Sequence, residues 1–330
     1  MQKHKGSALL FIALLILSVF AYGCIKQMAL QETKSEIIHP KDVKREIILS
    51  NAQNVIAVYF ATADGKNLVP ITLEVNPTQE MAKVATEKLL AGPSDENLKN
   101  ATPEGTKLKD LYKFDGIAYV DLTPEFLNAT INSEANMAVN ALVLTLTEFT
   151  QVDSVQILIN GKIPEKGYGD MDISKVLKRT PKINFYGAAA NGENLFSVYY
   201  SDKNAIYMVP MTFSSEEKPT LNVVIEKLLT DPPKNSNLVR PIWQGTKLLS
   251  IDRKADVVYV NLSKEVIAYG GGSVNEFSLV NALILTLTQI EGIKKVQLLI
   301  EGKKPQSLPE GTDVGTPWER PANINYIPKL

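Results

Sequence analysis

The chain has 330 residues, 45% of them hydrophobic, and a formal net charge of −1. Its length leaves room for two domains, or for one domain with extensions. Basic and acidic residues are interspersed along the chain, which gives no clustered basic surface and argues against nucleic-acid binding.

The first residues indicate export. Lys3 and Lys5 precede an apolar run from Ala8 to Tyr22. A membrane-spanning helix needs about 20 apolar residues, so this shorter run is typical of a signal peptide. It ends in Ala21-Tyr22-Gly23-Cys24, which resembles the lipobox of bacterial lipoproteins, in which the cysteine is acylated and becomes the mature N-terminus. The alternatives are an uncleaved signal anchor, or cleavage without lipidation.

Cys24 is the only cysteine, so no intramolecular disulfide can form. We predict a lipoprotein signal peptide at residues 1–24, with Cys24 as the site that attaches the protein to membrane lipid. The polar residues 25–51 are expected to tether the protein to the extracytoplasmic face of the cell membrane.

The remaining sequence repeats itself at an offset of about 140 residues, as Tyr59 and Tyr199 illustrate. The longest match is Asn140–Thr147, which recurs as Asn281–Thr288. One duplicated domain is therefore predicted, with its first copy at 52–187 and its second at 192–330.

The elements of each copy follow from local patterns. In the first copy we expect strands at 55–60 and 68–73, a helix from Asn76-Pro77 to Gly92-Pro93, a hairpin ending in a strand at 117–120, a helix at 134–149 and a last strand at 155–159. The order ββαββαβ predicts an α+β fold. Each copy would form a mostly antiparallel or mixed sheet with both helices on one face.

Common catalytic groups are absent from the copies. Both histidines, His4 and His39, precede residue 52, and so does the cysteine. A Ser-His-Asp or Cys-His arrangement cannot be built inside either copy, and a zinc site is not expected. We therefore expect a protein that is not an enzyme and has no cofactor and no metal.

Two acidic residues remain as a candidate pair. Asp121 and Glu125 lie four residues apart just after a strand and could form an acid–base pair. The second copy has Asn261 and Glu265 there. Because Asp, Asn, Ser and Thr all cap helices, we favour the interpretation that Asp121-Leu122-Thr123 and Asn261-Leu262-Ser263 cap the short helix that follows.

Two further features have a functional and a structural interpretation. Gly270, Gly271, Gly272 and Ser273 precede the second long helix and could hold an anion, but a P-loop lysine does not follow, so a plain loop is favoured. Tyrosines recur in predicted strands, where packing is a better explanation than a stacking platform; they are Tyr59, Tyr119, Tyr199 and Tyr259.

Several motifs, taken in order, resemble the sporulation and spore germination domain family, GerMN. They are Leu90–Pro93, Pro103–Thr106, Ala118–Leu122, Leu144–Phe149 and Val155–Gly161. The second copy departs from the family at Pro232-Pro233 and at Asn261. The resemblance implies a fold like the ring-building motifs of secretion systems and a non-enzymatic role. That role would be to support assembly of the channel complex between mother cell and forespore.

Our leading hypothesis is a scaffold that contacts envelope or sporulation channel proteins and could itself oligomerise. The alternative is a module that binds cell-wall glycan or a small anion, at the Gly270 loop or between the copies.

Overall fold

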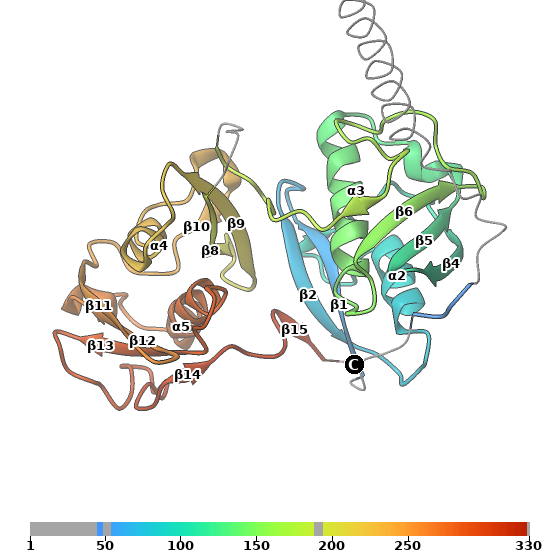
Figure 1. Cartoon of the computed structure of the whole chain (residues 1–330). Coiled ribbons are helices and arrows are strands. Elements are labelled where there is room, and N and C mark those ends of the chain that lie inside the picture. The colour runs from blue at the N-terminus through green and yellow to red at the C-terminus, as the bar shows by residue number, and fades with distance from the viewer. Residues whose placement is uncertain (1–44, 49–53, 188–193, 329–330) are drawn as a thin grey trace, which may run out of the picture. The chain divides into compact units, whose positions relative to one another are not determined.

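The computed structural model describes residues 45–48, 54–187 and 194–328 (Figure 1). The predicted signal peptide, Cys24 and most of the predicted tether lie outside these residues. The elements of the first copy are β1 (Val55–Thr62), β2 (Leu68–Glu74), α2 (Met81–Ala91), β3 (Leu98–Lys99), β4 (Leu108–Phe114), β5 (Ile117–Leu122), the 3-10 helix η1 (Pro124–Leu127), α3 (Asn132–Leu146), β6 (Ser154–Ile159) and β7 (Leu177–Lys178).

The second copy repeats this order and adds a 3-10 helix, η2, and a final short strand. Its elements are β8 (Asn194–Asp202), β9 (Met208–Ser215), α4 (Leu221–Leu228), η2 (Lys234–Ser236), β10 (Leu238–Val239), β11 (Leu248–Lys254), β12 (Val257–Leu262), η3 (Lys264–Ile267), α5 (Ser273–Leu287), β13 (Lys295–Ile300), β14 (Trp318–Glu319) and β15 (Tyr326–Ile327). The predicted α+β fold and the duplication are confirmed.

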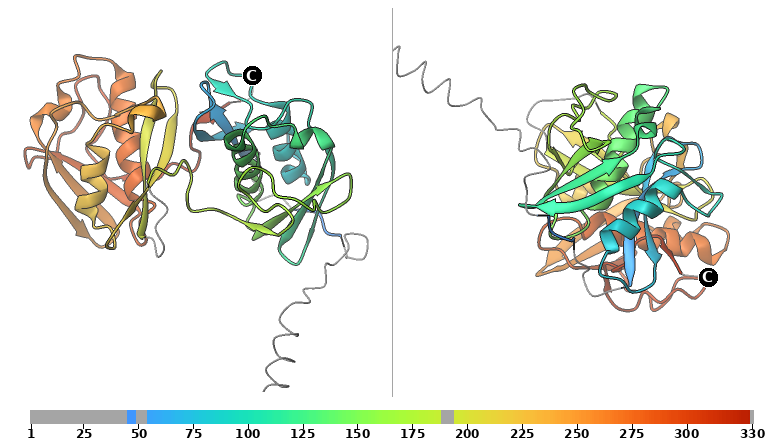
Figure 2. Two further views of the ribbon diagram at one scale, coloured as in Figure 1. Left: turned by 90° about the horizontal axis from the view of Figure 1, so that it is seen from above. Right: turned by 90° about the vertical axis from the view of Figure 1, so that its right-hand side faces the viewer.

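Each copy divides its strands between two sheets, a division that the element order does not specify. In the first copy β2, β1 and β3 form an antiparallel sheet, and β4, β5, β6 and β7 form a second sheet in which β5 and β6 are parallel. The long helix of the second copy packs against β8, as the orange helix beside the yellow strands shows (Figure 2). None of the helices in the described ranges is both long and apolar enough to cross a membrane.

The helical spacing correctly predicts the buried stripe of α3, but Val223 of α4, predicted on an apolar face, is exposed, and one predicted helix start is wrong. Ala138, Leu142 and Leu146 of α3 are buried in the core, as expected. The first helix begins at Met81, after Asn76-Pro77, and ends at Gly92 as predicted. The start is displaced because the Val75 amide still bonds to the Asn54 carbonyl (2.9 Å), which keeps the chain extended beyond β2.

A buried threonine of each long helix completes the hydrogen bonding of the neighbouring strand. β3 pairs only with Ala61 and Thr62, so the Tyr59 amide has no strand partner on that side. It donates instead to Oγ1 of Thr145 (3.1 Å), and the Tyr199 amide donates in the same way to Thr286 (3.0 Å). This contact gives a physical reason for the Leu-Thr-Leu-Thr repeat, since an unbonded buried amide is costly.

Candidate interaction surface

The last segment of each copy begins with an arginine fixed to the rest of that copy. Arg179 donates to the Leu144 carbonyl (3.0 Å) and to the hydroxyl of Tyr59 (2.8 Å), and it pairs with Glu148 (2.6 Å). Arg320 makes the matching contacts with Leu285 (3.0 Å) and Tyr199 (3.4 Å). Neither arginine stood out in the sequence, although both directly follow a short strand in the repeat.

Tyr59 has a structural role at this contact. Burial of its side chain raises the pKa of Tyr59 far above its ordinary value, and the nearby charge of Glu148 raises it further. The phenol therefore stays protonated and donates to Glu148 (2.8 Å) while it accepts from Arg179. Tyr59, Tyr119 and Tyr199 are buried in the sheets, which confirms the packing interpretation for these three residues, whereas Tyr259 is only partly buried.

Beyond these arginines, each segment pairs with the other copy. The carbonyl of Ile183 accepts from the Thr212 amide of β9 (3.1 Å), and the carbonyl of Ile324 accepts from the Thr72 amide of β2 (3.1 Å). β15 runs parallel to β2 beside its outer edge (Figure 1). Each copy thus extends a sheet of the other copy. We call the two segments that do so, residues 183–186 and 324–327, the exchanged segments.

An asparagine completes each exchange. Asn184 bonds to both backbone groups of Leu68 (2.7 and 2.8 Å) and to the Pro210 carbonyl (2.7 Å). Asn325 does the same with Met208 (2.8 Å for each bond) and Pro70 (2.8 Å). Because the same contacts occur in both directions, the two copies are related as the subunits of a symmetric dimer are.

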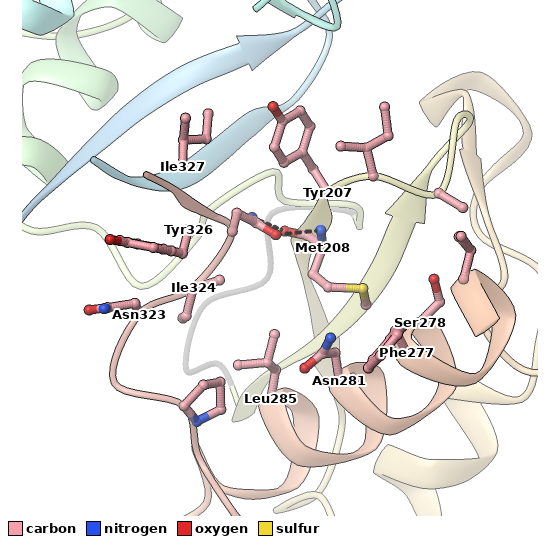
Figure 3. A pocket seen from close by; sticks show the side chains of 15 residues that line it. Tyr207, Met208, Phe277, Ser278, Asn281, Leu285, Asn323, Ile324, Tyr326 and Ile327 are labelled. Carbon is pink, nitrogen blue, oxygen red and sulfur yellow. Dashed lines mark hydrogen bonds between the residues drawn. The ribbon is translucent and has the colours of Figure 1, made fainter. Parts of the chain in front are cut away.

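A cavity of about 440 Å³ opens beside the second exchanged segment, between α5, the turn at 205–208 and the residues 321–327 (Figure 3). We call it the α5 hollow. Four apolar or aromatic side chains around it are strongly exposed: Ile206 (50%), Val274 (53%), Phe277 (57%) and Tyr326 (45%). Apolar groups gathered in this way mark interaction sites on protein surfaces.

The polar groups of the α5 hollow are neutral. Asn281 projects from α5 and Asn323 from the C-terminal segment, and none of the described residues that line the cavity is charged (Figure 3). A carboxamide can both donate and accept, so it suits a peptide backbone or a sugar hydroxyl. The chemistry of this hollow favours a neutral or apolar ligand group over an ion.

The first copy does not carry a matching apolar surface. Alignment of α3 with α5 places Asn136 at the position of Phe277 and Ser133 at that of Val274, and Lys66 corresponds to Ile206. Asn136 is held by Asp170, to which it donates at 2.7 Å. The duplicated domains have therefore diverged at this position, and the apolar character belongs to the second copy.

The N-cap residues of η1 and η3 are Thr123 and Ser263, the last residues of the two predicted capping segments, although neither side chain makes a capping hydrogen bond. Asp121 and Asn261 have a different role. Oδ1 of Asp121 accepts from the Gly161 amide, and Oδ1 of Asn261 accepts from the Gly302 amide, both at 2.7 Å. Both residues thus fix the turn after the last long strand, and Asp and Asn interchange because each has the required acceptor. Glu125 has a separate partner, the Thr123 hydroxyl, whose hydrogen bond lowers the pKa of Glu125.

The glycine loop lies in an acidic environment. Gly270, Gly271 and Gly272 have positive φ (73°, 107° and 100°), and Gly272 precedes the first residue of α5, Ser273. A Cβ at Gly271 would lie 3.3 Å from a carboxylate oxygen of Glu310. Glu276 is buried in the first turn of α5. The two carboxylates weaken the electrostatic case for an anion here, and the anion site stays a prediction.

Metal ligation has no visible basis in the part of the chain that the structure describes. Within those ranges, His, Cys, Asp and Glu side chains form no group of three or more that could hold a metal ion.

These features define a class of protein: a tandem α+β repeat in which the copies complete each other's sheets and one copy carries an apolar hollow. A model of the family described as sporulation and spore germination matches residues 57–165 and 197–306. The chain belongs to this family.

A relative and its solved domains agree with that assignment. The spore germination protein GerM of Bacillus subtilis (strain 168) is 29% identical over 274 residues, which cover 78% of this chain and 75% of that protein. The solved structure of the tandem GerMN domains of the sporulation protein GerM from Bacillus subtilis has a TM-score of 0.65 and 26% identity. That match covers 82% of this chain and 98% of the solved one.

Proposed function

We propose that this protein is an exported, lipid-anchored scaffold that supports assembly of an envelope complex during sporulation or germination, such as the channel between mother cell and forespore. The family and the relatives' names support the sporulation context. The signal-peptide pattern that ends at Cys24 supports export and lipid attachment. The absence of histidine and cysteine from the sequence of both copies supports a non-enzymatic role.

The observation that carries the scaffold proposal is the exposed apolar surface of the α5 hollow. It lies beside the exchanged strand that joins the copies, so a partner bound there would contact a well-supported part of the fold. Exposed aromatic and branched side chains around a cavity are typical anchors for protein partners.

The test replaces the apolar side chains by their counterparts from the first copy. The triple variant I206K/V274S/F277N should fold normally, because substitutions of exposed side chains change stability by only about 0.5 kcal/mol. Crosslinking in sporulating cells, followed by affinity purification, should recover envelope partners with the original protein and lose them with the triple variant.

A matched control is Val176→Ser, which removes an apolar side chain that is 41% exposed outside the hollow. This variant should retain the partners. Equal recovery of the same partners by the original protein and the triple variant would reject the hollow as the partner site. Cys24→Ala tests the anchor separately, since it should release the protein from the membrane fraction.

A glycan-binding function is the second candidate, because Phe277 and Tyr326 border a cavity that also contains Asn281 and Asn323. Aromatic faces and neutral amides suit an uncharged sugar. A thermal-shift titration with soluble muropeptides decides this candidate: a saturable stabilisation that Phe277→Asn abolishes would support it. No stabilisation at any concentration would exclude it.

A further inference from the structure

A short segment ahead of the first copy covers the outer edge of β4. The amide and carbonyl of Glu46 bond to the carbonyl and amide of Lys113 (2.9 and 2.7 Å), as in an antiparallel strand pair. Arg45 lies over the Tyr112 ring (4.5 Å) and pairs with Asp110 (2.6 Å). We call residues Arg45–Ile48 the leader; its last residue, Ile48, is buried in the core.

The corresponding edge in the second copy is open. β11 is the counterpart of β4 and lies at the edge of its sheet, and none of the described segments pairs with its outer side. Arg253 is opposite Val258 as Lys113 is opposite Ala118, so the backbone groups of Arg253 face outward as those of Lys113 do. Leu249 is 46% exposed on this strand.

The exchange of strands explains why the edge is open. The residues that precede the second copy at the position of the leader include Tyr186. The Tyr186 amide donates to the Thr212 carbonyl of β9 (2.9 Å), as part of the exchanged segment. Because this stretch pairs with β9, it cannot also pair with the outer edge of β11 in the way that the leader pairs with the outer edge of β4.

We propose that the open edge of β11 binds an extended segment of a partner protein by strand addition. The segment carries a basic residue and, three positions later, a branched apolar residue, as Arg45 and Ile48 do in the leader. Main-chain hydrogen bonds supply the affinity in this mode of recognition, and alternate side chains supply the specificity.

The side chains of β11 suit that segment. Asp252 takes the place of Tyr112, so the basic residue of the partner has a carboxylate on the same face of the strand. Lys254, at the place of Phe114, lies on that face too, with its ammonium over the Tyr259 ring (5.3 Å). Ile251 takes the place of Leu111, opposite the position of the branched apolar residue. The contact differs from the α5 hollow in both surface and chemistry, so the proposal goes beyond the scaffold function.

The probe is a fluorescent peptide with the sequence of residues 43–50, titrated against the full-length protein in detergent. It should bind saturably. Methylation of the peptide nitrogen that corresponds to Glu46 should weaken binding about fivefold, because it removes one hydrogen-bond donor on the pairing side. Methylation at the next residue, whose amide faces away, is the matched control and should have little effect.

A charge exchange locates the site. Asp252→Lys should weaken binding of this peptide, and a peptide with glutamate in place of its arginine should bind that variant and not the original protein. A photoreactive group in the peptide should crosslink to residues 248–254. No saturable binding, crosslinks confined to residues 108–114, or equal affinity for both charge forms would each overturn the proposal, whatever the result for the α5 hollow.

Discussion

Asn184 and Asn325 are equivalent residues of the two copies, and each one bonds to both copies at once. Both have a positive φ (48° and 51°), and each carboxamide makes three hydrogen bonds to the backbone of β2 and β9. Asparagine is suited to both demands, since it tolerates the left-handed region and carries donors and an acceptor on one short side chain.

We predict that Asn184→Ala and Asn325→Ala each lower the free energy of unfolding by about 2–4 kcal/mol. The loss combines unsatisfied backbone groups with the cost of a Cβ at positive φ. Urea unfolding followed by circular dichroism measures the loss.

The matched control for this prediction is Asn184→Gly, which permits the positive φ but removes the amide. It should cost less than Asn184→Ala and still more than about 1 kcal/mol. If both variants have the same midpoint urea concentration as the original protein, the hydrogen bonds of the Asn184 carboxamide contribute little to stability.

The contacts that Arg179 and Arg320 make within their own copies differ by one charge. Glu148 beside Arg179 is replaced by Gln289 in the second copy. We predict that Arg179→Met destabilises the protein by about 1–3 kcal/mol and more than Arg320→Met does, a modest value because the ion pair is partly exposed.

A double-mutant cycle isolates the ion pair of the first copy. Arg179→Met combined with Glu148→Gln should show a coupling free energy that falls as salt concentration rises. The same cycle with Arg320→Met and Gln289→Ala should show no dependence on salt. Equal salt dependence of the two cycles would contradict the assignment.

The sequence predicts the elements of this fold well because their signals are local. The apolar spacing that marks α3, for example, lies within sixteen consecutive positions, 134–149, and a matching stripe recurs in α5. The helix start predicted at Asn76 is wrong because strand pairing continues beyond β2 to Val75. Here a contact with Asn54, from another part of the chain, overrides a local capping preference.

The exchange of strands was beyond prediction for a physical reason. Asn325 bonds to Pro70 across 255 positions of sequence, and the segment around it is too short to show a hydrophobic period. Asp121 illustrates a related limit, since its partner Gly161 lies 40 positions away while a capping site lies next to it. Asn184 and Asn325 are nevertheless 141 positions apart, close to the repeat offset, so the sequence does indicate that they are equivalent.

The threonine that completes the β1 edge gives a third prediction. Thr145→Val should destabilise the protein by about 1–3 kcal/mol, because it leaves the Tyr59 amide buried without an acceptor. Thr145→Ser keeps the hydroxyl and should recover most of that loss. A thermal denaturation series of both variants, repeated at Thr286 in the second copy, checks the effect; equal melting temperatures for the Val and Ser variants would refute it.

Glu276 makes the stability of the second copy sensitive to acid. The side chain is fully buried, and its carboxylate accepts from the amides of Glu310 (2.6 Å) and Thr312 (3.1 Å) and from the Tyr269 hydroxyl. Burial raises the pKa of Glu276, but hydrogen bonds from Thr312 and Tyr269 outweigh it and hold the pKa below its ordinary value. The first copy has Ala135 at this position.

A carboxyl whose pKa is lowered by folding stabilises the folded state above its unfolded pKa, and this stabilisation is lost as pH falls through the folded pKa. The free energy of unfolding should therefore decline below about pH 4.5. Glu276→Gln should be less stable than the original protein at neutral pH, and its free energy of unfolding should change less with pH in this acid range. Urea unfolding at a series of pH values measures both slopes. Glu310→Gln, which removes an exposed carboxyl near the same loop, is the control and should keep the original slope. An unchanged acid slope in Glu276→Gln would show that other carboxyls carry the acid sensitivity.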